Sequence, residues 1–463
     1  MPSTKKDKFI ISPHLVIRKH QDDFVVYHAL FGNPLILNSS SIQLLNIFET
    51  AMSIADVNEQ YSIEDIEEWL DLFMKNSFLT VEHGDERSYL EKTTDEVIKK
   101  ICSGKQLSSL GLILDEACNF DCAYCISKKV ISASDRKSEK PQRMTWAVAK
   151  KAVDRFVAFA GKNHEELEIY FGGSEPLLNW QLMKKVIEYC LNNYGSQYKF
   201  TFSTNTNSSL ITAEKAKFLG RHKVTITTSL DGQAEVNDKI RRFASGKGTF
   251  KQIISGWDNL SSFAQKVEWI CLTLTEQNID QINEEFFDFL STREITSCSI
   301  EPDIICSGKI PAEKMVSALL KFKEMGAKKG ISVGGLWDKP LKNMFEDDIL
   351  KKLFNCSAFT GRGISVLATG DIVPCSYSAT KVGHIDEFES IFSSALYRSL
   401  VSSRIIGKIE TCKGCEIEGQ CIGGCYITTE YGNCLGSDET FIYRCEIFKK
   451  ITQYLLSAAV DCS

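Results

Sequence analysis

The sequence lacks both an excess of basic residues and a long uncharged apolar run. Lys and Arg together number 54 against 60 Asp and Glu, which gives a formal net charge of -6. No overall basic field is available to attract a phosphate backbone, so nucleic acid is not an expected partner. No uncharged apolar run reaches the roughly 18 residues that indicate a membrane span, and the polar segment 1–8 does not resemble a secretion signal. We therefore expect a cytoplasmic protein that makes no membrane contact.

The sequence does have a large apolar content and many cysteines. Its 463 residues are 43% apolar, enough to bury a large core, and the length suggests roughly three domains. In a reducing compartment, 17 cysteines more often bind metal than form disulfides. Ten fall into two tight patterns, and a scattered one such as Cys190, on an expected amphipathic helix, is predicted to be a small buried hydrophobe. The scattered cysteines are Cys102, Cys190, Cys271, Cys298, Cys306, Cys434 and Cys462.

The N-terminal region combines short strand-like stretches with three helical ones. The clearest helix follows Ser62 and Asp65, which form a capping-box pattern. Its apolar stripe has helical period and consists of Ile63, Ile66, Leu70 and Phe73. These features predict a small winged-helix module of α+β type at 1–85, followed by a charged linker at 86–107.

From Leu110 to Pro302 strand-like segments alternate with amphipathic helical ones. The predicted strands are Gly111–Leu114, Leu167–Phe171, Lys199–Ser203, Val224–Ser229, Val267–Thr275 and Cys298–Glu301. The helical segments include Trp146–Phe159, with Thr145 as its N-cap, and Trp180–Leu191. Six β/α units of this kind predict a parallel sheet with helices outside and reactive loops at the carboxyl ends of the strands.

The first predicted strand runs directly into a loop with three thiols within eight residues, Cys118, Cys122 and Cys125. Three thiolates ligate three irons of a [4Fe–4S] cube and leave the fourth iron without a protein ligand. Such an open position usually means that a small molecule binds there and reacts. A structural zinc site is the alternative, because Cys122 and Cys125 have CxxC spacing, but no fourth Cys or His lies close by.

This CxxxCxxC loop, with Tyr124 before the last cysteine, resembles the signature loop of the radical S-adenosylmethionine (SAM) superfamily. The resemblance implies a partial (β/α)6 radical SAM barrel at 108–310. It also implies that the open iron chelates SAM, and that one electron from the cluster cleaves SAM to methionine and a 5'-deoxyadenosyl radical. That radical abstracts hydrogen from a substrate, and a reductant such as flavodoxin or ferredoxin supplies the electron. The protein's own part is then placement, electrostatics and exclusion of side reactions.

The end of the second predicted strand resembles the Gly-Gly-Glu-Pro motif of that superfamily, which meets the methionine ammonium. The matching residues are Gly172, Gly173, Ser174 and Glu175. Glycines permit a close approach of the backbone to the ligand. Because Ser174 is inserted relative to the motif, either the Glu175 carboxylate or the Ser174 backbone is expected to make the contact.

Three further stretches resemble other SAM-binding positions. Ser203 and Asn205 follow the third predicted strand, and Ser229 and Asp231 follow the fourth, where short polar side chains face the ribose. Arg241 resembles an arginine near the methionine carboxylate, for which its planar fork is suited. For any one of these residues alone, a role in a turn or a helix cap is the alternative.

A second cysteine pattern occupies the C-terminal region. Cys356 is followed by thirteen residues, Gly370, four residues and Cys375; Cys412-x2-Cys415-x5-Cys421-x3-Cys425 and Cys445 come later. The pattern resembles the SPASM extension of peptide-modifying radical SAM enzymes, which holds two auxiliary [4Fe–4S] clusters. The resemblance implies a SPASM domain at 356–463, after a bridging region at 311–355, and three [4Fe–4S] clusters in all.

By the same resemblance, one auxiliary cluster is enclosed by Cys412, Cys415, Cys421 and Cys445. The other is held by Cys356, Cys375 and Cys425. Its fourth position is Cys434, another side chain, or an open iron available to a substrate thiolate, and we favour the open iron. A pair of zinc knuckles is the alternative, because CxxC-x5-CxxxC could also build these.

The N-terminal module resembles the RiPP recognition element, which captures the leader of a ribosomally synthesised precursor peptide. The resemblance lies in Pro13–Ile17, Phe24–Tyr27, Pro34–Asn38 and the helices up to Leu79. Such modules bind by strand addition, in which an edge strand supplies main-chain hydrogen bonds. The alternative is an accessory domain that only packs, because a winged fold by itself does not imply function.

Together these resemblances imply a maturase that acts on a precursor peptide. The leading hypothesis is a thioether between a precursor cysteine and a carbon, in the manner of sactipeptide and ranthipeptide enzymes. Carbon–carbon crosslinking, related oxidations and formylglycine formation on a sulfatase are the alternatives. A non-catalytic zinc or electron-transfer protein that binds peptides is the alternative from a different class. No catalytic acid or base can be named from the sequence.

Overall fold

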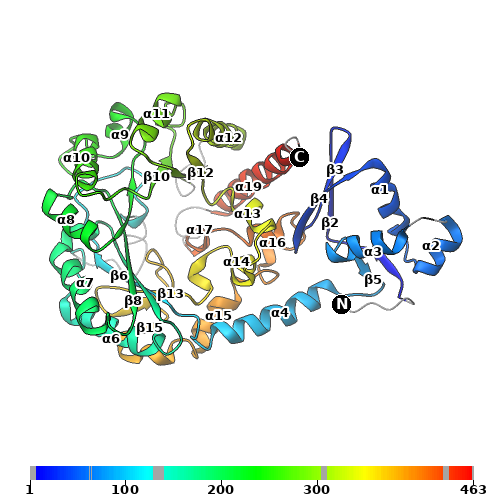
Figure 1. The fold of residues 1–463 in the computed structure, drawn as a ribbon, viewed down its shortest axis with the longest axis horizontal. Coiled ribbons are helices and arrows are strands. Elements are labelled where there is room, and N and C mark those ends of the chain that lie inside the picture. The colour runs from blue at the N-terminus through cyan, green and yellow to red at the C-terminus, as the bar shows by residue number, and fades with distance from the viewer. Residues whose placement is uncertain are drawn as a thin grey trace.

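The computed structural model describes residues 7–460 apart from positions 62 and 64 and the segments 129–139, 304–309 and 431–436. Figure 1 shows a curved sheet with helices on its convex side at one end of the molecule and a small α+β module at the other. The C-terminal region fills the space between them. No helix in the described part of the chain is long and apolar enough to cross a membrane.

The N-terminal module contains an antiparallel sheet in the order β2-β3-β4, a two-stranded pair of β1 and β5, and three helices. Its elements are β1 (Phe9–Ile11), β2 (Leu15–His20), β3 (Asp23–His28), β4 (Gly32–Asn38), α1 (Ser39–Asn46), α2 (Ile54–Tyr61), α3 (Ile66–Lys75) and β5 (Leu79–Val81). Successive residues of a strand point to opposite faces. Val26 and Leu37 accordingly pack against the module's own helices, whereas Val25 and Tyr27 join the main core.

The start of α3 differs from the capping-box prediction. The helix begins at Ile66, and the preceding Asp65 has a left-handed φ of 57° and makes no capping hydrogen bond. Ser62 lies outside the described residues. A capping box requires its acidic member inside the first turn, so the predicted pattern is wrong here. The predicted stripe is nevertheless buried at Ile66, Leu70 and Phe73.

The segment predicted as a linker is helix α4 (Glu86–Ile101). Asp85 caps it by accepting a hydrogen bond from the Ser88 N–H at 3.0 Å. Its buried face includes Leu90 and Ile98, and Figure 1 shows it running from the module to the barrel. The charged residues of this segment therefore form the exposed face of an amphipathic helix.

The N-terminal module is docked on the C-terminal region through backbone and charged contacts. The Gly419 N–H donates to the Ala29 carbonyl at 2.8 Å. A Cβ at position 419 would lie 1.8 Å from the Leu30 carbonyl oxygen, so only glycine permits this approach. Arg87 of α4 makes a bidentate pair with Glu418 at 3.0 and 2.9 Å.

All six predicted strands of the α/β region are present and parallel. They are β6 (Ser109–Asp115), β7 (Glu166–Gly173), β8 (Lys199–Thr206), β9 (Thr225–Ser229), β10 (Trp269–Leu274) and β11 (Ser297–Pro302). The helices that accompany them are α6 (Trp146–Ala160), α7 (Trp180–Tyr194), α8 (Ala213–Arg221), α9 (Ala234–Ile240), α10 (Phe250–Ser261) and α11 (Glu284–Thr292). Thr145 caps α6 as predicted, accepting from the Val148 N–H at 3.4 Å. Cys190 of α7 is fully buried, as predicted.

The sheet is longer than six strands, because the regions on either side of the barrel extend it. Beyond β11 the bridging region adds β12 (Ser332–Gly334) in parallel, and beyond β6 the C-terminal region adds β13 (Gly363–Val366) in parallel. Strands β14 (Asp371–Val373) and β15 (Gly383–His384) follow antiparallel. Strands of two to four residues are too short to show an apolar period, so the sequence did not predict them.

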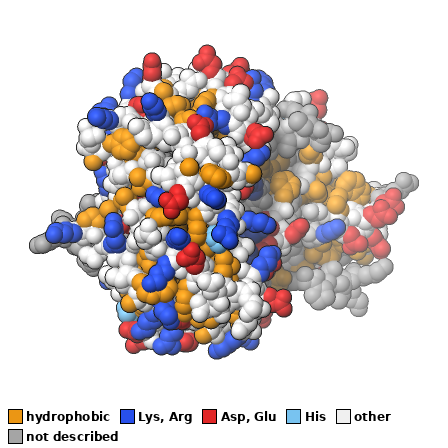
Figure 2. Space-filling model, turned by 60° about the vertical axis from the view of Figure 1, so that its left-hand side comes forward, with side chains coloured by type: hydrophobic (Ala, Val, Ile, Leu, Met, Phe, Trp, Pro, Cys, Tyr) orange, Lys and Arg blue, Asp and Glu red, His pale blue; other side chains and the backbone are white. Residues whose placement is uncertain are grey.

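The remaining helices lie in the bridging and C-terminal regions. They are α12 (Ala312–Lys328), α13 (Lys339–Met344), α14 (Ile349–Leu353), α15 (Ala395–Ser402), α16 (Glu418–Cys421), α17 (Tyr426–Glu430) and α19 (Ser437–Val460). Helix α19 packs on α12 and buries Ile447, Phe448 and Ile451. On the outer surface of the barrel, Figure 2 shows positive and negative side chains interspersed.

Candidate active site

The concave face of the sheet is lined by polar side chains from neighbouring strands. Tyr170 pairs with Ser203, and Cys271 pairs with both Ser229 and Ser299. Each of these five side chains is partly exposed, whereas the residues that flank it along the chain are buried. Since side chains alternate between the two faces of a strand, the five lie on the face away from the covering helices. This polar face is the floor of the candidate site.

The three cysteines of the predicted catalytic loop lie directly after β6 and are partly exposed. Burial, together with the neighbouring Glu175, Cys122 and Cys125, raises the pKa of the Cys118 thiol to about 12. Burial raises the pKa of Cys122 to about 11. Without metal, the Cys118 and Cys122 thiols would stay protonated at neutral pH, so iron must displace their protons on binding.

The donor set of this loop fits an iron–sulfur cluster. It offers three thiols in one loop with a Phe120 N–H that donates to the Cys118 sulfur at 3.4 Å. Among the described residues, no three His, Cys, Asp or Glu side chains converge where a single metal ion would sit. In a four-iron cube each thiolate binds a different iron.

Tyr124, Asp231 and Arg241 form a buried network that anchors this loop to the sheet. The Tyr124 hydroxyl donates to Asp231 Oδ2 at 2.5 Å, and Arg241 Nε lies 2.7 Å from the same oxygen. Asp231 Oδ1 accepts from Arg241 Nη2 at 3.2 Å and from the Thr273 N–H at 2.9 Å. Burial opposes the charge of Arg241, but Asp231, Tyr124 and Cys122 together outweigh it and hold the pKa of Arg241 above its ordinary value.

This network corrects one predicted role and leaves another open. Both oxygens of Asp231 are occupied inside the protein and its side chain is fully buried, so the predicted ribose contact does not match the structure. Arg241 has further donors and stays the predicted partner of the methionine carboxylate. Asp231 instead holds Tyr124 and Arg241 in place.

Glu175 also faces inward. Its Oε1 accepts from the Leu177 N–H at 3.0 Å and the Thr206 hydroxyl at 2.6 Å, and its Oε2 accepts from the Asn207 N–H at 2.8 Å. The side chain is fully buried, and burial raises its pKa. Of the two predicted contacts to the methionine ammonium, the carboxylate is therefore the one that the geometry disfavours.

The Gly172–Glu175 segment lies against the cysteine loop. The Ser174 N–H donates to the Asp115 carbonyl at 2.8 Å, and the Glu175 N–H donates to the Ala117 carbonyl at 3.1 Å. Gly173 has a φ of 130°, and a Cβ there would lie 2.4 Å from the Asp115 oxygen. The Glu175 carbonyl accepts from the Leu178 N–H at 3.2 Å, so among the described residues the Ser174 carbonyl is the one of these two left for an ammonium ligand.

The predicted ribose-side residues differ in whether their side chains already have hydrogen-bond partners within the protein. The Ser203 hydroxyl donates to Glu168 Oε1 at 3.0 Å. Asn205 and Ser229 are partly exposed at the carboxyl ends of β8 and β9, and neither side chain has a hydrogen-bond partner within the described residues. Asn205 and Ser229 are therefore the better placed to receive a ligand.

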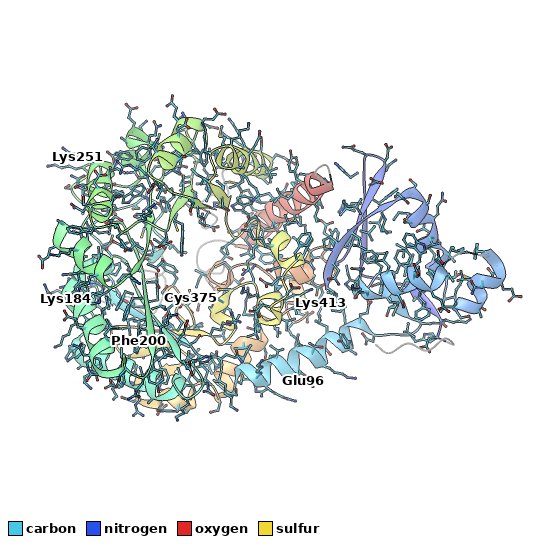
Figure 3. The ribbon with its side chains drawn as sticks, viewed as in Figure 1. Glu96, Lys184, Phe200, Lys251, Cys375 and Lys413 are labelled. Carbon is cyan, nitrogen blue, oxygen red and sulfur yellow. The ribbon has the colours of Figure 1, made fainter. Side chains whose placement is uncertain are left out.

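The C-terminal cysteines fall into two sets of electrostatic neighbours, and their role as cluster ligands stays a prediction. In the first set, burial together with Cys356 and Cys425 raises the pKa of Cys375 to about 12. Figure 3 shows Cys375 on the concave side of the sheet, whereas Lys184 and Lys251 extend outward from the covering helices. The first set therefore faces the same interior as the catalytic loop. The predicted alternative ligand Cys434 lies outside the described residues, as do Cys306 and Cys462.

The second set lies further along the C-terminal region. Burial, followed by the neighbouring Cys445 and Cys415, raises the pKa of Cys412 to about 11. For Cys421, burial dominates and raises the pKa to about 12, and Cys445, Cys412 and Cys415 add to it. Four mutually close thiols can enclose a cluster completely.

Tyr377 connects the catalytic loop with the first auxiliary set. Burial raises its pKa, and the charges of Tyr170, Cys375, Cys125 and Cys271 raise it further. The sequence analysis did not single out this residue. Its position two residues after Cys375 was the only signal, and chain order could not show that Cys125 is among its electrostatic neighbours.

Glu301 is an acidic residue on the concave face that the sequence analysis also missed. It accepts hydrogen bonds from the Leu336 N–H at 2.9 Å and the Ser299 hydroxyl at 3.2 Å. Burial raises its pKa to about 7. Glu301 ends the sixth predicted strand, where a polar residue at the carboxyl end of a parallel strand was the available signal.

Two family models match the chain, one across the catalytic loop and one across Cys356, Cys375, Cys412 and Cys415 of the C-terminal region. Residues 112–290 match the radical SAM superfamily, and residues 356–416 match SPASM, an iron-sulfur cluster-binding domain.

Similar proteins cover most of the chain. The radical SAM cyclopropyl synthase TigE of Paramaledivibacter caminithermalis is 24% identical over 95% of this chain and 94% of its own. A cysteine-type anaerobic sulfatase-maturating enzyme of Clostridium novyi is 23% identical over 76% of this chain and 96% of its own. The structure of Streptococcus suis SuiB bound to S-adenosylmethionine has the same fold, with a TM-score of 0.53 and 15% identity over 93% of this chain and 98% of SuiB.

The family models, the parallel sheet and the three cysteine groups agree with one another. The zinc and simple electron-transfer alternatives account for none of the matched barrel. The chain therefore contains a radical SAM domain followed by a SPASM iron–sulfur cluster-binding domain.

Proposed function

We propose that this protein is a peptide maturase that modifies a ribosomally synthesised precursor peptide. The observation that carries the proposal is the placement of the catalytic cysteine loop and the first auxiliary set around one polar concave face. Ile126, which directly follows Cys125, packs against Ile427, and so do Cys375 and Cys425 of the first auxiliary set. A peptide lying on this face would reach both groups at once. SuiB, which has the same fold, has also been solved bound to its precursor peptide SuiA.

The residues of this chain have distinct roles in the proposed reaction. Cys118, Cys122 and Cys125 would hold the catalytic cluster, which together with bound SAM supplies the oxidising 5'-deoxyadenosyl radical. The Tyr124–Asp231–Arg241 network keeps the loop in place against β9 and β10. We assign the methionine end to the Ser174 carbonyl and Arg241, and the ribose to Asn205 and Ser229.

We further propose that the N-terminal module holds the leader by adding it to an edge of the three-stranded sheet. Strands β2 and β4 are the two edges, and each presents one exposed isoleucine, Ile17 at 40% and Ile36 at 42% exposure. A cavity of about 630 Å³ lies beside β2, between the sheet and helices α12 and α19. An extended peptide binds such an edge through its main chain and fills neighbouring pockets with side chains.

Deletion of residues 1–82 is expected to weaken binding of a leader-bearing peptide while SAM cleavage continues. Ile17→Asp and Ile36→Asp are matched point variants on the two edges, and both positions are exposed enough for a small effect on stability. We expect one of them to weaken leader binding at least tenfold in fluorescence anisotropy. Equal affinity of the deletion variant and the intact protein would contradict the recognition role.

For the bond that is formed, we propose a thioether between a precursor cysteine and a carbon of the same peptide. Its formation would break one C–H bond, whose hydrogen atom goes to the 5'-deoxyadenosyl radical, and one S–H bond, whose proton is released; the one remaining electron would pass to the auxiliary cluster. An open iron at the Cys356, Cys375 and Cys425 set would bind that cysteine as its thiolate. The second candidate is carbon–carbon bond formation, which is favoured by the similarity to a cyclopropyl synthase along 95% of this chain. Formylglycine formation is favoured by the similarity to a sulfatase-maturating enzyme. This reaction would not explain why the chain has an N-terminal module suited to binding a leader peptide.

Co-expression with a small cysteine-containing peptide encoded beside this protein should yield a product that has lost two hydrogens per link, as measured by mass spectrometry. Thioether and carbon–carbon products have the same mass, so thiol alkylation separates them. A thioether removes one alkylatable cysteine per link, whereas a carbon–carbon link leaves every cysteine reactive. An unmodified peptide, with the leader present and SAM consumed, would contradict the maturase proposal.

A further inference from the structure

Two buried arginines lie between the auxiliary cysteine sets. Arg444 is 1% exposed and Arg404 is 7% exposed. Arg444 immediately precedes Cys445 of the second set, and its Nη1 donates to the carbonyl of Cys425 of the first set at 3.4 Å. Both arginines therefore contact the short chain segment that joins the two sets.

The hydrogen bonds of the two guanidinium groups go to main-chain carbonyls. Arg444 Nη2 donates to the Gly423 carbonyl at 2.7 Å, and Arg404 Nη2 donates to the Gly424 carbonyl at 3.1 Å. Arg444 Nε is buried and has no partner within the described residues. Neutral carbonyls orient these cations but do not cancel their charge.

The connection between Cys421 and Cys425 is shaped around these side chains. Gly423 and Gly424 have φ values of 67° and 64°. A Cβ on Gly424 would lie 3.1 Å from Arg444 Cζ, and a Cβ on Gly423 would lie 2.8 Å from the Ile409 side chain. Glycine at both positions thus permits the turn and leaves room for the guanidinium of Arg444.

The protein supplies no carboxylate for either cation in the part of the chain that the structure describes. Among the described residues, Arg241 is the remaining arginine with an exposed fraction of at most 9%, and it is paired with Asp231. Aromatic rings lie near both, Tyr426 at 5.5 Å from Arg404 and Phe441 at 5.0 Å from Arg444. A cation–π contact offsets only a part of the free energy that burial of each ion costs.

The missing negative charge is available in the neighbouring cysteine sets. Thiolates that ligate a [4Fe–4S] cluster bring a net negative charge into this buried region. An orphaned guanidinium nitrogen and two unpaired cations beside the thiols fit such an anionic group. We infer that Arg404 and Arg444 are the counter-ions of the auxiliary clusters and raise their reduction potentials. The inference relies on the proposed auxiliary clusters.

The physical reason is that a reduced cluster carries one more negative charge than the oxidised one. A buried cation stabilises the reduced form more, and the interaction is strong because the surroundings have a low dielectric constant. Arg404 and Arg444 are positioning residues in this role, since neither touches substrate or SAM. Their loss would change the potential at which the auxiliary clusters are reduced.

The test uses the full chain with Cys118, Cys122 and Cys125 replaced by alanine, so that only auxiliary clusters are observed. Potentiometric titration with dithionite, followed by electron paramagnetic resonance, measures the midpoint potentials. Arg444→Met and Arg404→Met should each change the ratio of reduced to oxidised cluster at a fixed potential about tenfold, or about 59 mV downward for a one-electron couple. Arg444→Lys and Arg404→Lys should keep most of the potential, because they keep the charge.

Arg398→Met is the matched control, because Arg398 is exposed on α15 of the same region. If both Met variants keep full iron content and unchanged midpoint potentials, the inference about the arginines is overturned and the cluster assignment is not affected. If a Met variant loses iron, retention of iron by the corresponding Lys variant supports the charge role, and equal loss in both overturns it. Absence of auxiliary iron in the background protein would overturn the inference together with the cluster assignment.

Discussion

Replacement of Cys118, Cys122 and Cys125 together by alanine is expected to abolish formation of 5'-deoxyadenosine and to leave the auxiliary iron in place. The intact protein should hold about twelve irons with matching sulfide, and the variant about eight. The two auxiliary sets belong to the C-terminal region and share no ligand with the catalytic loop, so their clusters should assemble independently. The measurements are iron and sulfide content after anaerobic purification and chromatography of the nucleoside product.

The matched control for this variant is Cys102→Ala. Cys102 is a partly exposed free cysteine at the end of α4 and belongs to none of the three groups. Its replacement should leave iron content and SAM cleavage unchanged. Undiminished SAM cleavage by the triple variant would refute the assignment of the catalytic loop, and so would a colourless, zinc-loaded protein in place of the iron protein.

Asp231→Ala is expected to lower the free energy of unfolding by about 3–5 kcal/mol, because it leaves the buried guanidinium of Arg241 without its counter-ion. Asp231 also accepts the Tyr124 hydroxyl and the Thr273 N–H, so the substitution leaves two more donors unsatisfied. Denaturant unfolding followed by circular dichroism, under anaerobic conditions and at equal iron content, measures the change. We also expect loss of SAM cleavage, since the catalytic loop loses its anchor.

Two further variants distinguish the loss of the Asp231–Arg241 ion pair from a general loss of charge. Asp258→Ala removes an exposed carboxylate paired with Arg293 and should cost at most about 1 kcal/mol. In a double-mutant cycle, Arg241→Met combined with Asp231→Ala should be less destabilising than the sum of the single substitutions. An effect of Asp231→Ala no larger than that of Asp258→Ala would show that the network does not stabilise the loop.

Local sequence patterns were sufficient for the elements that have a long period or a strong cap. The six strands of the barrel and the start of α6 at Thr145 were predicted close to their observed positions. Burial of Cys190 was predicted as well, because helical spacing alone places it on the inner face of α7. The start of α3 was missed, because a left-handed residue at Asp65 replaces the capping box.

Contacts between distant segments were the part that the sequence could not reveal. Asp231 was predicted to bind ribose, but the partners that occupy its oxygens lie 107, 10 and 42 residues away. The Thr206 and Asn207 groups that hold Glu175 inward lie 31 and 32 residues from it. The region of Tyr377 and Cys375 lies near the catalytic loop because β13 pairs with β6, the strand that leads into that loop.

The sequence by itself determined the chemistry of this protein, since the cysteine spacings within single loops and the order of strands and helices are local properties of the chain. Only the tertiary structure decided which polar groups remain free for a ligand. A carboxylate such as Asp231 or Glu175 is available or occupied according to donors from other strands, and burial makes an unmatched donor or charge costly enough to enforce that pairing. Because of the same cost, the buried cations Arg404 and Arg444 require a negative charge nearby.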